Sequence, residues 1–460
     1  MKAAAERVGW CPGALRPMAS GDGLILRVKP RGGRLSVEQA RGIAEVARRY
    51  GNGAMDLTRR ANLQIRGLRE DGLAPALGRL AALGLLDPNP EAEAVRNVVS
   101  SPLAGIGDPS VIPDGAKRRS GIHAGLAPDD RGDGSRTVAP AALVRDDKDG
   151  RPWHGRQAVF DISPHVAALE SRLVETPALH ALPAKFAFVV DDGGPLGLRD
   201  VPADIRFEAL RTMRGAAFAV RLGGGEDLAG LCTPEDLADA AEALSRVVLN
   251  SGGIEIRRMA DLVARDGAEG ILRQAGLDLC EAPQSSAAAP RDAIGPLGVA
   301  FGVGAPFGRL DAAALETVAA AAHELRLTPW RSILLAGLDR PHDVAASCAA
   351  VGLIVDPADA RLAVTACVGA PGCRRASTPV LDHAARLARR LGVATAGDGI
   401  VVHLSGCRKG CAHAGTAPVT LVASEGRYDL VRGGRAGDPP ARRSLDFDEA
   451  LHCATRELHA

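Results

Sequence analysis

The sequence lacks a long hydrophobic run: nowhere do about 18 apolar residues follow one another, so no membrane-spanning helix is expected. The first residues, MKAAAERVGWCPGALRP, lack the apolar core of a secretory signal. A strong net charge is also missing, since the formal charge is +1, and nothing global indicates a nucleic-acid or membrane-surface binder. We therefore expect a cytoplasmic protein that binds neither nucleic acid nor a membrane.

Aromatic residues are scarce, at 3% of the chain, whereas nine cysteines are present. A disulfide framework is excluded as their main purpose, because the number is odd and a large protein in a reducing compartment has little use for disulfides. Four of the cysteines lie within one window of 45 residues. Clustered thiols in such a protein favour a metal site.

An internal repeat organises the chain, which at 460 residues is too long for one ordinary hydrophobic core. The first copy covers residues 33–68 and the second covers residues 308–338. Both copies open with Gly-Arg-Leu and close with Gly-Leu. The repeat predicts a duplicated, pseudo-symmetric α+β fold.

The first copy contains the signals of a helix followed by a strand. Ser36 and Gln39 have the spacing of a capping box, apolar residues follow at helical spacing, and Gly51 can end the helix. Apolar and polar residues then alternate over 57–66, which predicts one strand with an apolar face and a polar face. Upstream, GLILRVKP reads as another strand.

The four clustered cysteines have the spacing C-x5-C, then 33 residues, then C-x3-C; they are Cys367, Cys373, Cys407 and Cys411. Four thiolates suit one [4Fe–4S] cluster. Zinc is the competing metal, but its sites usually pair cysteines across roughly two to four residues. Neighbouring glycines would let the backbone wrap closely round a cofactor. Core packing is expected for the remaining cysteines, Cys11, Cys232, Cys280, Cys348 and Cys453.

At these cysteines the chain resembles the sulfite and nitrite reductase superfamily, whose members bind a [4Fe–4S] cluster beside a sirohaem through the same spacing. The internal repeat matches the duplicated ferredoxin-like halves of that superfamily. The resemblance implies that the four cysteines bind the cluster. It also implies an α+β, pseudo-two-fold duplicated reductase-like fold, with ferredoxin-like half-repeats and two larger α/β cofactor-binding domains.

The resemblance and two polar tracts together predict the domain boundaries. EAPQSSAAAPRD has the composition of a linker, and the tract at about 112–156, rich in Gly, Asp and Arg, is expected to be a surface insertion. The expected segments are a ferredoxin-like half-repeat at 18–88, a reductase-like domain at 89–280 that contains the insertion, a linker at 281–294, a second half-repeat at 295–350 and a [4Fe–4S]-binding domain at 351–460.

Three segments match the basic residues of the superfamily's anion pocket. LTRRANLQIRG places Arg60 at the first position, VRNVVSSPLAG supplies Arg96, and LPAKFAFVV supplies Lys185. The superfamily has another lysine two positions later, but here the residue is Ala187, which by strand alternation would face the same side as Lys185. Because the reductases use the paired lysines to deliver charge and protons to a small oxyanion, this departure argues against reduction of sulfite or nitrite.

Five segments also look like one branch of the superfamily: CPGALRPMASGDGLILRVKP, GNGAMDLTRRANLQIRGL, RNVVSSPLAGI, ACVGAPGC and HLSGCRKGCAHAGTAPVTLVASEGRYDLVRGGRAGDP. This branch acts on precorrin-3A in aerobic cobalamin biosynthesis instead of carrying a tetrapyrrole permanently. This resemblance implies a monooxygenase that hydroxylates precorrin-3A with O2 and closes a γ-lactone. The cluster would supply electrons from an external donor, a reductase or an NADH-linked protein, and a mononuclear non-haem iron would activate oxygen. A sirohaem-dependent sulfite or nitrite reductase is the alternative, and a non-enzymatic iron–sulfur electron carrier is a third possibility.

A precorrin carries many carboxylates, and the planar fork of arginine binds a carboxylate in a bidentate way. An arginine-rich polar strand face therefore suits this substrate. The expected substrate-binding residues are Arg60, Asn62, Gln64, Arg66, Arg96 and Lys185, with Arg27, Lys29 and Arg31 as further candidates upstream. His403 and His413 bracket the C-x3-C motif and could contact a cofactor or hydrogen-bond behind it. No residue is assigned as catalytic.

Overall fold

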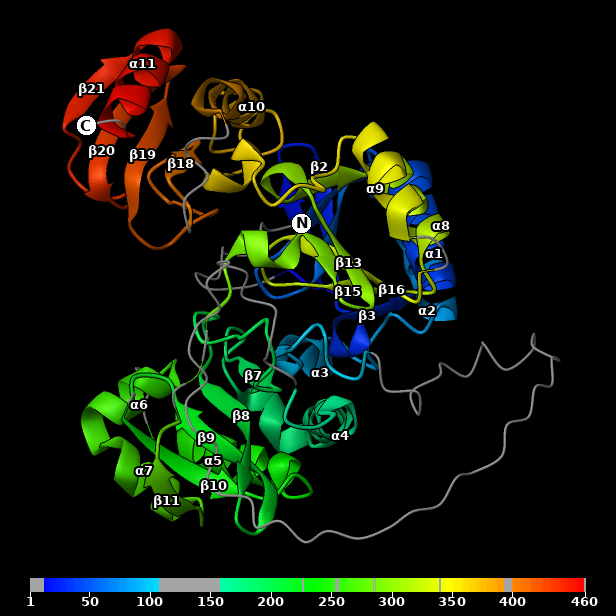
Figure 1. The fold of residues 1–460 in the computed structure, drawn as a ribbon, viewed down its shortest axis with the longest axis vertical. Coiled ribbons are helices and arrows are strands. Elements are labelled where there is room, and N and C mark those ends of the chain that lie inside the picture. Colours follow the sequence, from blue (N-terminus) through cyan, green and yellow to red (C-terminus); the bar gives the residue numbers. More distant parts are fainter. Residues whose placement is uncertain are drawn as a thin grey trace, which may run out of the picture.

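The protein is described from a computed structural model that covers residues 12–106, 158–225, 227–252, 256–283, 285, 287–338, 341–392 and 399–458. The insertion expected at about 112–156 and Cys11 lie outside these residues. The described chain forms four sheets, two small and antiparallel and two mixed. In Figure 1 the mixed sheets form separate lobes, one green and one orange to red, and the small sheets lie in a third.

Each copy of the repeat builds one small sheet, and the two copies exchange a strand. The first sheet has the order β1-β2-β5-β4-β14, and the second has the order β12-β13-β16-β15-β3. Strand β14 of the second copy pairs with β4, and β3 of the first copy pairs with β15. The strands are β1 Met18–Ser20, β2 Gly23–Val28, β3 Arg34–Ser36, β4 Ala54–Leu57, β5 Leu63–Leu68, β12 Gly295–Leu297, β13 Ala300–Gly304, β14 Arg309–Asp311, β15 Glu324–Leu327 and β16 Ser332–Ala336. The duplicated α+β fold predicted from the repeat is confirmed.

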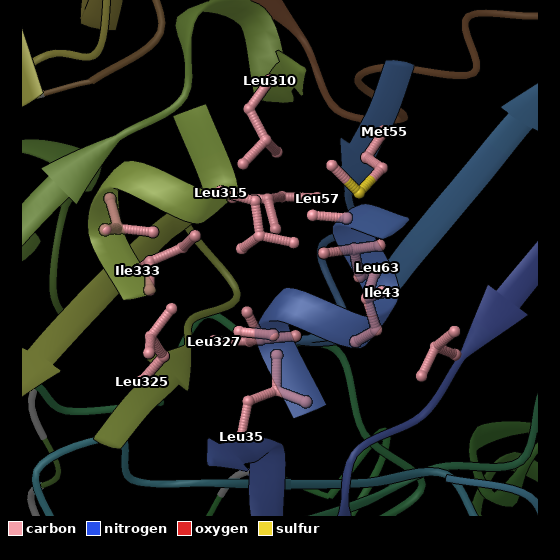
Figure 2. Close-up of a cluster of buried hydrophobic side chains, with 14 of the residues drawn as sticks. Leu35, Ile43, Met55, Leu57, Leu63, Leu310, Leu315, Leu325, Leu327 and Ile333 are labelled. Carbon is pink, nitrogen blue, oxygen red and sulfur yellow. The ribbon is translucent and has the colours of Figure 1, made fainter. Parts of the chain in front are cut away.

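The helices of the two copies pack together over a shared core. The capping box predicted at Ser36 is present: its hydroxyl accepts from the Gln39 amide at 3.1 Å, and the helix ends before Gly51. The helices are α1 Val37–Tyr50, α2 Leu73–Ala82, α8 Ala312–Ala321 and α9 Pro341–Ala350. Figure 1 shows α1, α8 and α9 side by side. Figure 2 shows that leucine and isoleucine side chains from both copies meet in one buried cluster, so the two copies share one hydrophobic core.

The single strand expected over 57–66 is wrong: β4 ends at Leu57, β5 begins at Leu63, and a turn joins them. The Thr58 carbonyl accepts from the amide of Ala61 at 3.1 Å, and the Thr58 hydroxyl accepts from the amide of Asn62 at 3.2 Å. Ala61 has a φ of 51°, which no strand residue adopts. The alternation of apolar and polar residues gave a wrong prediction here because the turn occupies five residues, after which the alternation resumes in β5.

The two mixed sheets share one pattern, in which three parallel strands are followed by antiparallel ones. The first contains β6 Val98–Ser100, β7 Phe188–Asp191, β8 Ile205–Thr212, β9 Gly215–Leu222, β10 Leu228–Cys232 and β11 Asp278–Glu281, covered by α3 Pro90–Val95, α4 Ser163–Glu175, α5 Leu237–Asn250, α6 Met259–Asp266 and α7 Ala268–Gln274. The second contains β17 Val364–Ala366, β18 Val402–Ser405, β19 Ala417–Ser424, β20 Arg427–Gly434 and β21 Arg442–Leu445, with α10 Val380–Leu391 and α11 Phe447–Leu458. We propose that the four sheets correspond to the domains predicted from the sequence.

In the described part of the chain, no helix combines the length and the apolar character that crossing a membrane requires.

Candidate functional site

The second mixed sheet brings the four clustered cysteines to one edge. Strands β17 and β18 run parallel, so their carboxyl ends lie side by side, and Cys367 and Cys407 follow those ends. The amide of Cys367 donates to the carbonyl of Leu404 at 3.1 Å, which fixes the two segments together. All four cysteines line a cavity of about 370 Å³, called the cysteine cavity below.

The backbone lies close to the thiol of Cys367. The Gly406 amide donates to its Sγ atom at 3.0 Å, and a Cβ at Gly406 would stand 3.3 Å from that sulfur and 2.9 Å from Ala376. Burial raises the pKa of the Cys367 and Cys411 thiols, while hydrogen bonds from the backbone amides of Gly406 and Gly369 act in the opposite direction at Cys367. Amide donors aimed at sulfur favour the thiolate, the form that binds metal.

The four thiols are the residues that could hold an iron–sulfur cluster. Within the described residues, no three His, Cys, Asp or Glu side chains are placed so that they could hold one metal ion. A [4Fe–4S] cube takes one thiolate on each of four iron atoms, so its ligands surround a space instead of a point. Four free cysteines round one cavity meet that requirement. Elsewhere, Cys232 and Cys348 are buried in cores, as expected.

The polar wall of the cysteine cavity comes from the first small sheet. Arg27 and Gln64 are register partners on β2 and β5, and both line the cavity. With its amide oriented to suit both groups, the Gln64 oxygen accepts from Arg27 Nη2 at 2.8 Å. The polar strand face predicted to bind substrate thus lines a cavity.

Two arginines follow each other in the turn after β4, and they point to different neighbours. Arg60 lines the cysteine cavity, and its Nη2 donates to the carbonyl of Lys185 at 3.2 Å. Arg59 lines both the cysteine cavity and a neighbouring one of about 580 Å³, called the outer cavity. Although much of the Arg59 side chain is solvent-exposed, the surrounding protein lowers the pKa of its guanidinium. Arg59 reaches both cavities because it lies in this turn, which was not predicted from the sequence.

Arg331 reaches the same junction from the second copy. Its guanidinium donates to the carbonyl of Ala412 at 2.9 Å and to the hydroxyl of Thr365 at 3.2 Å, and it has no carboxylate among its described partners. Burial, followed by repulsion from Arg59, lowers its pKa to about 10. The Asp56 carboxylate, which also lines the cysteine cavity, acts in the opposite direction on the Arg331 pKa.

Arg331 is not among the site residues predicted from the sequence, although the repeat contains a signal for it. When LTRRANL of the first copy is set against LTPWRSI of the second, Arg331 falls at the position of Ala61. Both residues have the left-handed φ of a turn, 51° at Ala61 and 61° at Arg331. At equivalent positions of the two turns, the second copy therefore has the arginine side chain of Arg331 and the first copy has the methyl group of Ala61.

His403 and His413 lie behind this junction. His403 is fully buried on β18, neither ring nitrogen has a hydrogen-bond partner within the described structure, and burial lowers its pKa to about 4. Its ring meets that of His413 edge to face, with centroids 5.7 Å apart. His413 lines the outer cavity, and its Nε2 lies 3.0 Å from the carbonyl oxygen of Thr416.

Three of the predicted substrate-binding residues do not line either cavity. Asn62 is buried in the turn, and Lys185 is exposed ahead of β7. Arg96 is 4% exposed, and its guanidinium bonds Asp87 at 2.8 Å and Glu170 at 3.1 Å. Contact with a substrate would require Arg96 to leave two buried carboxylates, so we do not retain that role.

The structure also contradicts the expectations for Lys29 and Ala187. Lys29 is 6% exposed and donates to the Asn97 side chain at 2.9 Å, so it is an interior residue. Ala187 lies before β7 begins at Phe188, so strand alternation with Lys185 does not apply. Ala187 is buried, its amide donates to Asp204 at 2.9 Å, and it presents no side chain to the cavities.

The comparisons with known proteins agree with this architecture. Residues 16–83 match the nitrite/sulfite reductase ferredoxin-like half domain. The fold is similar to the solved structure of the NirA protein of Mycobacterium tuberculosis, with a TM-score of 0.69 over 94% of this chain and 80% of that one, at 19% identity. The hemoprotein β-component of an NADPH sulfite reductase from Acidithiobacillus ferrooxidans is 27% identical, over 94% of this chain and 81% of the relative. The fold and the site thus define an enzyme of the nitrite and sulfite reductase superfamily.

A further relative narrows the assignment within that superfamily. Precorrin-3B synthase of Sinorhizobium sp is 30% identical over 459 residues, which cover 95% of this chain and 85% of the relative. The chain belongs to the precorrin-3B synthase family and is an oxidoreductase.

Proposed function

We propose that the protein catalyses the oxygen-dependent conversion of precorrin-3A to precorrin-3B, by hydroxylation and γ-lactone formation. The observation that carries this proposal is the junction of Arg59 and Arg331, two cations without a described carboxylate partner beside a cavity lined by four cysteines. Such a wall suits a ligand with several carboxylates more than a small oxyanion. The similarity to precorrin-3B synthase over 95% of the chain supports the same substrate.

The four cysteines would hold a [4Fe–4S] cluster, which supplies electrons one at a time when bound. Arg59 and Arg331 would bind substrate carboxylates at the junction of the two cavities, and Arg60 and Arg27 would bind others along the cysteine cavity. Gln64 keeps the Arg27 fork in place through its amide oxygen. Fixing several carboxylates at once orients a flexible macrocycle, so that one meso carbon is presented to the reaction.

Sulfite or nitrite reduction is the second candidate, and the lining of the cavities argues against it. The family resemblance assigns oxyanion reduction to a pair of lysines, but no lysine is among the described lining residues of either cavity. Lys185 is exposed outside them, and Ala187 occupies the place of the second lysine. The superfamily relatives support a common fold, and the departure at these positions supports a different reaction.

The proposed reaction needs electrons from outside the substrate. One oxygen atom of O2 would enter the product as hydroxyl and the other would leave as water, which requires two electrons from an external donor. We retain the mononuclear iron as part of the proposal without assigning its ligands. The donor would dock near Cys411, which is exposed, on the side where four exposed cations, Arg374, Arg375, Arg408 and Lys409, directly follow Cys373 and Cys407 in the chain.

The test is turnover of precorrin-3A by protein purified under anaerobic conditions. Conversion is expected only when O2 and a reductant are both present, and one atom from ¹⁸O2 should appear in the product as hydroxyl. The purified protein should show the broad absorption of an iron–sulfur cluster without a haem-like Soret band. Turnover without oxygen, or stoichiometric sirohaem in the purified protein, would replace this proposal with the reductase.

A further inference from the structure

We propose that Arg66 is a positioning residue: together with Ser20 and Asp22 it clamps the loop Cys367–Cys373 against the turn between β1 and β2, and so fixes Cys373 at the cysteine cavity. This inference rests on the proposed role of the cysteines as cluster ligands, although the clamp itself can be tested without substrate. The place of Arg66 on a polar strand face predicts substrate binding instead.

Arg66 is 3% exposed, and every nitrogen of its guanidinium is occupied. Nε and Nη2 form a fork on the two oxygens of Asp22, both at 2.9 Å, and Nη1 donates to Asp56 at 3.0 Å. Nη2 also donates to the carbonyl of Gly372 at 2.6 Å. Each of the three nitrogens already donates to a protein group, which fixes the guanidinium in place where it lines the cysteine cavity.

The carbonyl of Gly372, which directly precedes Cys373, is where the clamp meets the cysteine loop. It accepts from the Ser20 hydroxyl at 2.6 Å and from the Gly21 amide at 3.3 Å, in addition to Arg66. The contact is close: a Cβ at Gly21 would stand 2.2 Å from the carbonyl oxygen of Pro371. After the loop, Arg374 Nε donates back to the carbonyl of Ser20 at 3.0 Å.

The clamp extends into the second copy of the repeat. Asp56 accepts from Arg66 with one oxygen and from Arg309 Nε on β14 with the other, at 2.8 Å. The network thus contains two arginines and two aspartates in balance. It ties the first copy, the exchanged strand and the cysteine loop into one unit. Moving the loop would leave the Gly372 carbonyl without its three donors and would break the hydrogen bond from Arg66 Nη2, in a buried place.

A purely structural role for Arg66 in the first sheet is the competing explanation, and Arg96 offers a matched control. Arg96 is also buried, is also bonded to two carboxylates, and lies outside both cavities. If burial of an ion pair were all that mattered, Arg66→Met and Arg96→Met would affect the cluster alike.

The experiment measures the loss of iron and acid-labile sulfide from the full-length holoprotein under a ferrous chelator, with the EPR signal of the reduced cluster as a second readout. Arg66→Met should shorten the cluster lifetime by about 10- to 100-fold, if the lifetime falls as metal affinity does when a residue that orients metal ligands is removed. It should also change the EPR signal. Arg66→Lys should recover only part of the lifetime, because an ammonium cannot form the fork. Arg96→Met should keep the parent lifetime and signal.

Milder variants cover the case in which Arg66→Met does not fold. Ser20→Ala removes one donor to Gly372, and Gly21→Ala pushes the turn away from Pro371, so both should shorten the cluster lifetime. In cluster-free protein, the same variants should speed amide hydrogen exchange in residues 368–374. Parent-like lifetime, signal and exchange in folded variants would overturn the clamp. A failed precorrin turnover test would leave these results unchanged, which separates the two proposals.

Discussion

At the scale of single residues, arginine serves two purposes in this protein, and carboxylate partners separate them. Arg66 and Arg96 are buried on aspartate and glutamate, where removal of the arginine would strand charges. Arg59 and Arg331 face the cavities without a described carboxylate partner. The sequence pattern cannot separate the arginines paired with carboxylates from those without a described carboxylate partner, because only folding brings the carboxylates to them. The partners of Arg66 are Asp22 and Asp56, and the partners of Arg96, Asp87 and Glu170, lie far apart in the chain.

The cysteines yield the first prediction. Cys407→Ser should remove the iron and acid-labile sulfide of the purified protein, because serine does not supply the thiolate that the cluster needs. Cys453→Ser is the control, since Cys453 lies on α11 away from the cysteine cavity. Chemical iron and sulfide analysis of both variants checks the outcome, and parent-level content in Cys407→Ser would show that the assignment is wrong.

The second prediction concerns the arginine junction. Arg331→Ala and Arg59→Ala should each weaken precorrin binding by roughly 1.5 to 3 kcal/mol, the value of one hydrogen bond to a charged group, while the cluster spectrum stays intact. Arg60→Ala should also weaken binding. Lys185→Ala serves as the control, because the Lys185 side chain lies outside both cavities. Equilibrium titration with the tetrapyrrole measures each effect, and unchanged affinity in Arg331→Ala would exclude the junction from the substrate site.

The third prediction follows from the buried ring of His403, whose pKa burial lowers from 6.5 to about 4. Between these values the unfolded state binds more protons than the folded one, so stability is complete above pH 6.5 and falls as the pH is lowered towards 4. The loss should amount to about 3 kcal/mol. Denaturant unfolding of cluster-free protein should show this slope in the parent and in the exposed control His452→Leu, and a smaller slope in His403→Leu. An equal slope in all three proteins would contradict the assignment.

At the scale of elements, local signals located the first helix well and the following turn badly. Ser36, Gln39 and Gly51 carry strong helix-end signals, and α1 runs between them. The turn between β4 and β5 has no glycine or proline, and Ala61 takes the left-handed conformation that glycine usually supplies. Thr58 stabilises that turn through its hydroxyl, which accepts from the amides of Arg60 and Asn62. Such a contact depends on folded geometry that the alternating pattern does not reveal.

The helix start gives the fourth prediction. Ser36→Ala should lower the free energy of unfolding by about 0.5 to 2 kcal/mol, because the amide of Gln39 loses its acceptor. Ser36→Asp should keep most of the stability, since aspartate also accepts at this position. Denaturant titration of cluster-loaded protein measures both. Because Ser36 also ends the exchanged strand β3, equal stability of the parent and Ser36→Ala would show that strand pairing with β15 alone fixes the helix start.

At the scale of the whole molecule, the repeat predicted the duplication but not the exchange of strands. β3 and β14 each leave their own copy for the other sheet, and the shared core in Figure 2 follows from that exchange. The duplication also reaches the mixed sheets. Strand β6 corresponds to β17, and Ser101 follows β6 as Cys367 follows β17. Strand β7 corresponds to β18: the Ser101 hydroxyl donates to Asp191 at the end of β7, whereas the end of β18 leads to Cys407. Equivalent strand ends thus carry a hydrogen bond in one domain and thiols in the other.

The position of the cysteines on the molecule decides how electrons would reach them. Cys411 is exposed, so the proposed cluster would lie near the surface, and the exposed cations Arg374, Arg375, Arg408 and Lys409 directly follow Cys373 and Cys407 in the chain. The chain as a whole is nearly neutral, with a formal charge of +1. A local group of cations on a neutral protein speeds encounter with an acidic partner, and salt screens the effect over about 10 Å at 0.1 M.

The fifth prediction tests this surface with reduced plant-type ferredoxin as an acidic probe. Replacing both Arg408 and Lys409 by Glu should slow cluster reduction about tenfold at low ionic strength, with little effect at high salt, because rim charges act mainly on the association rate. Reduction by a neutral mediator should be unchanged. The control replaces Arg389 and Arg390, exposed at the far end of α10, about 15 Å along the helix from its start near the cysteines. Stopped-flow absorbance measures the rates, and equal slowing by both pairs would mean that general charge, and not this surface, guides the donor.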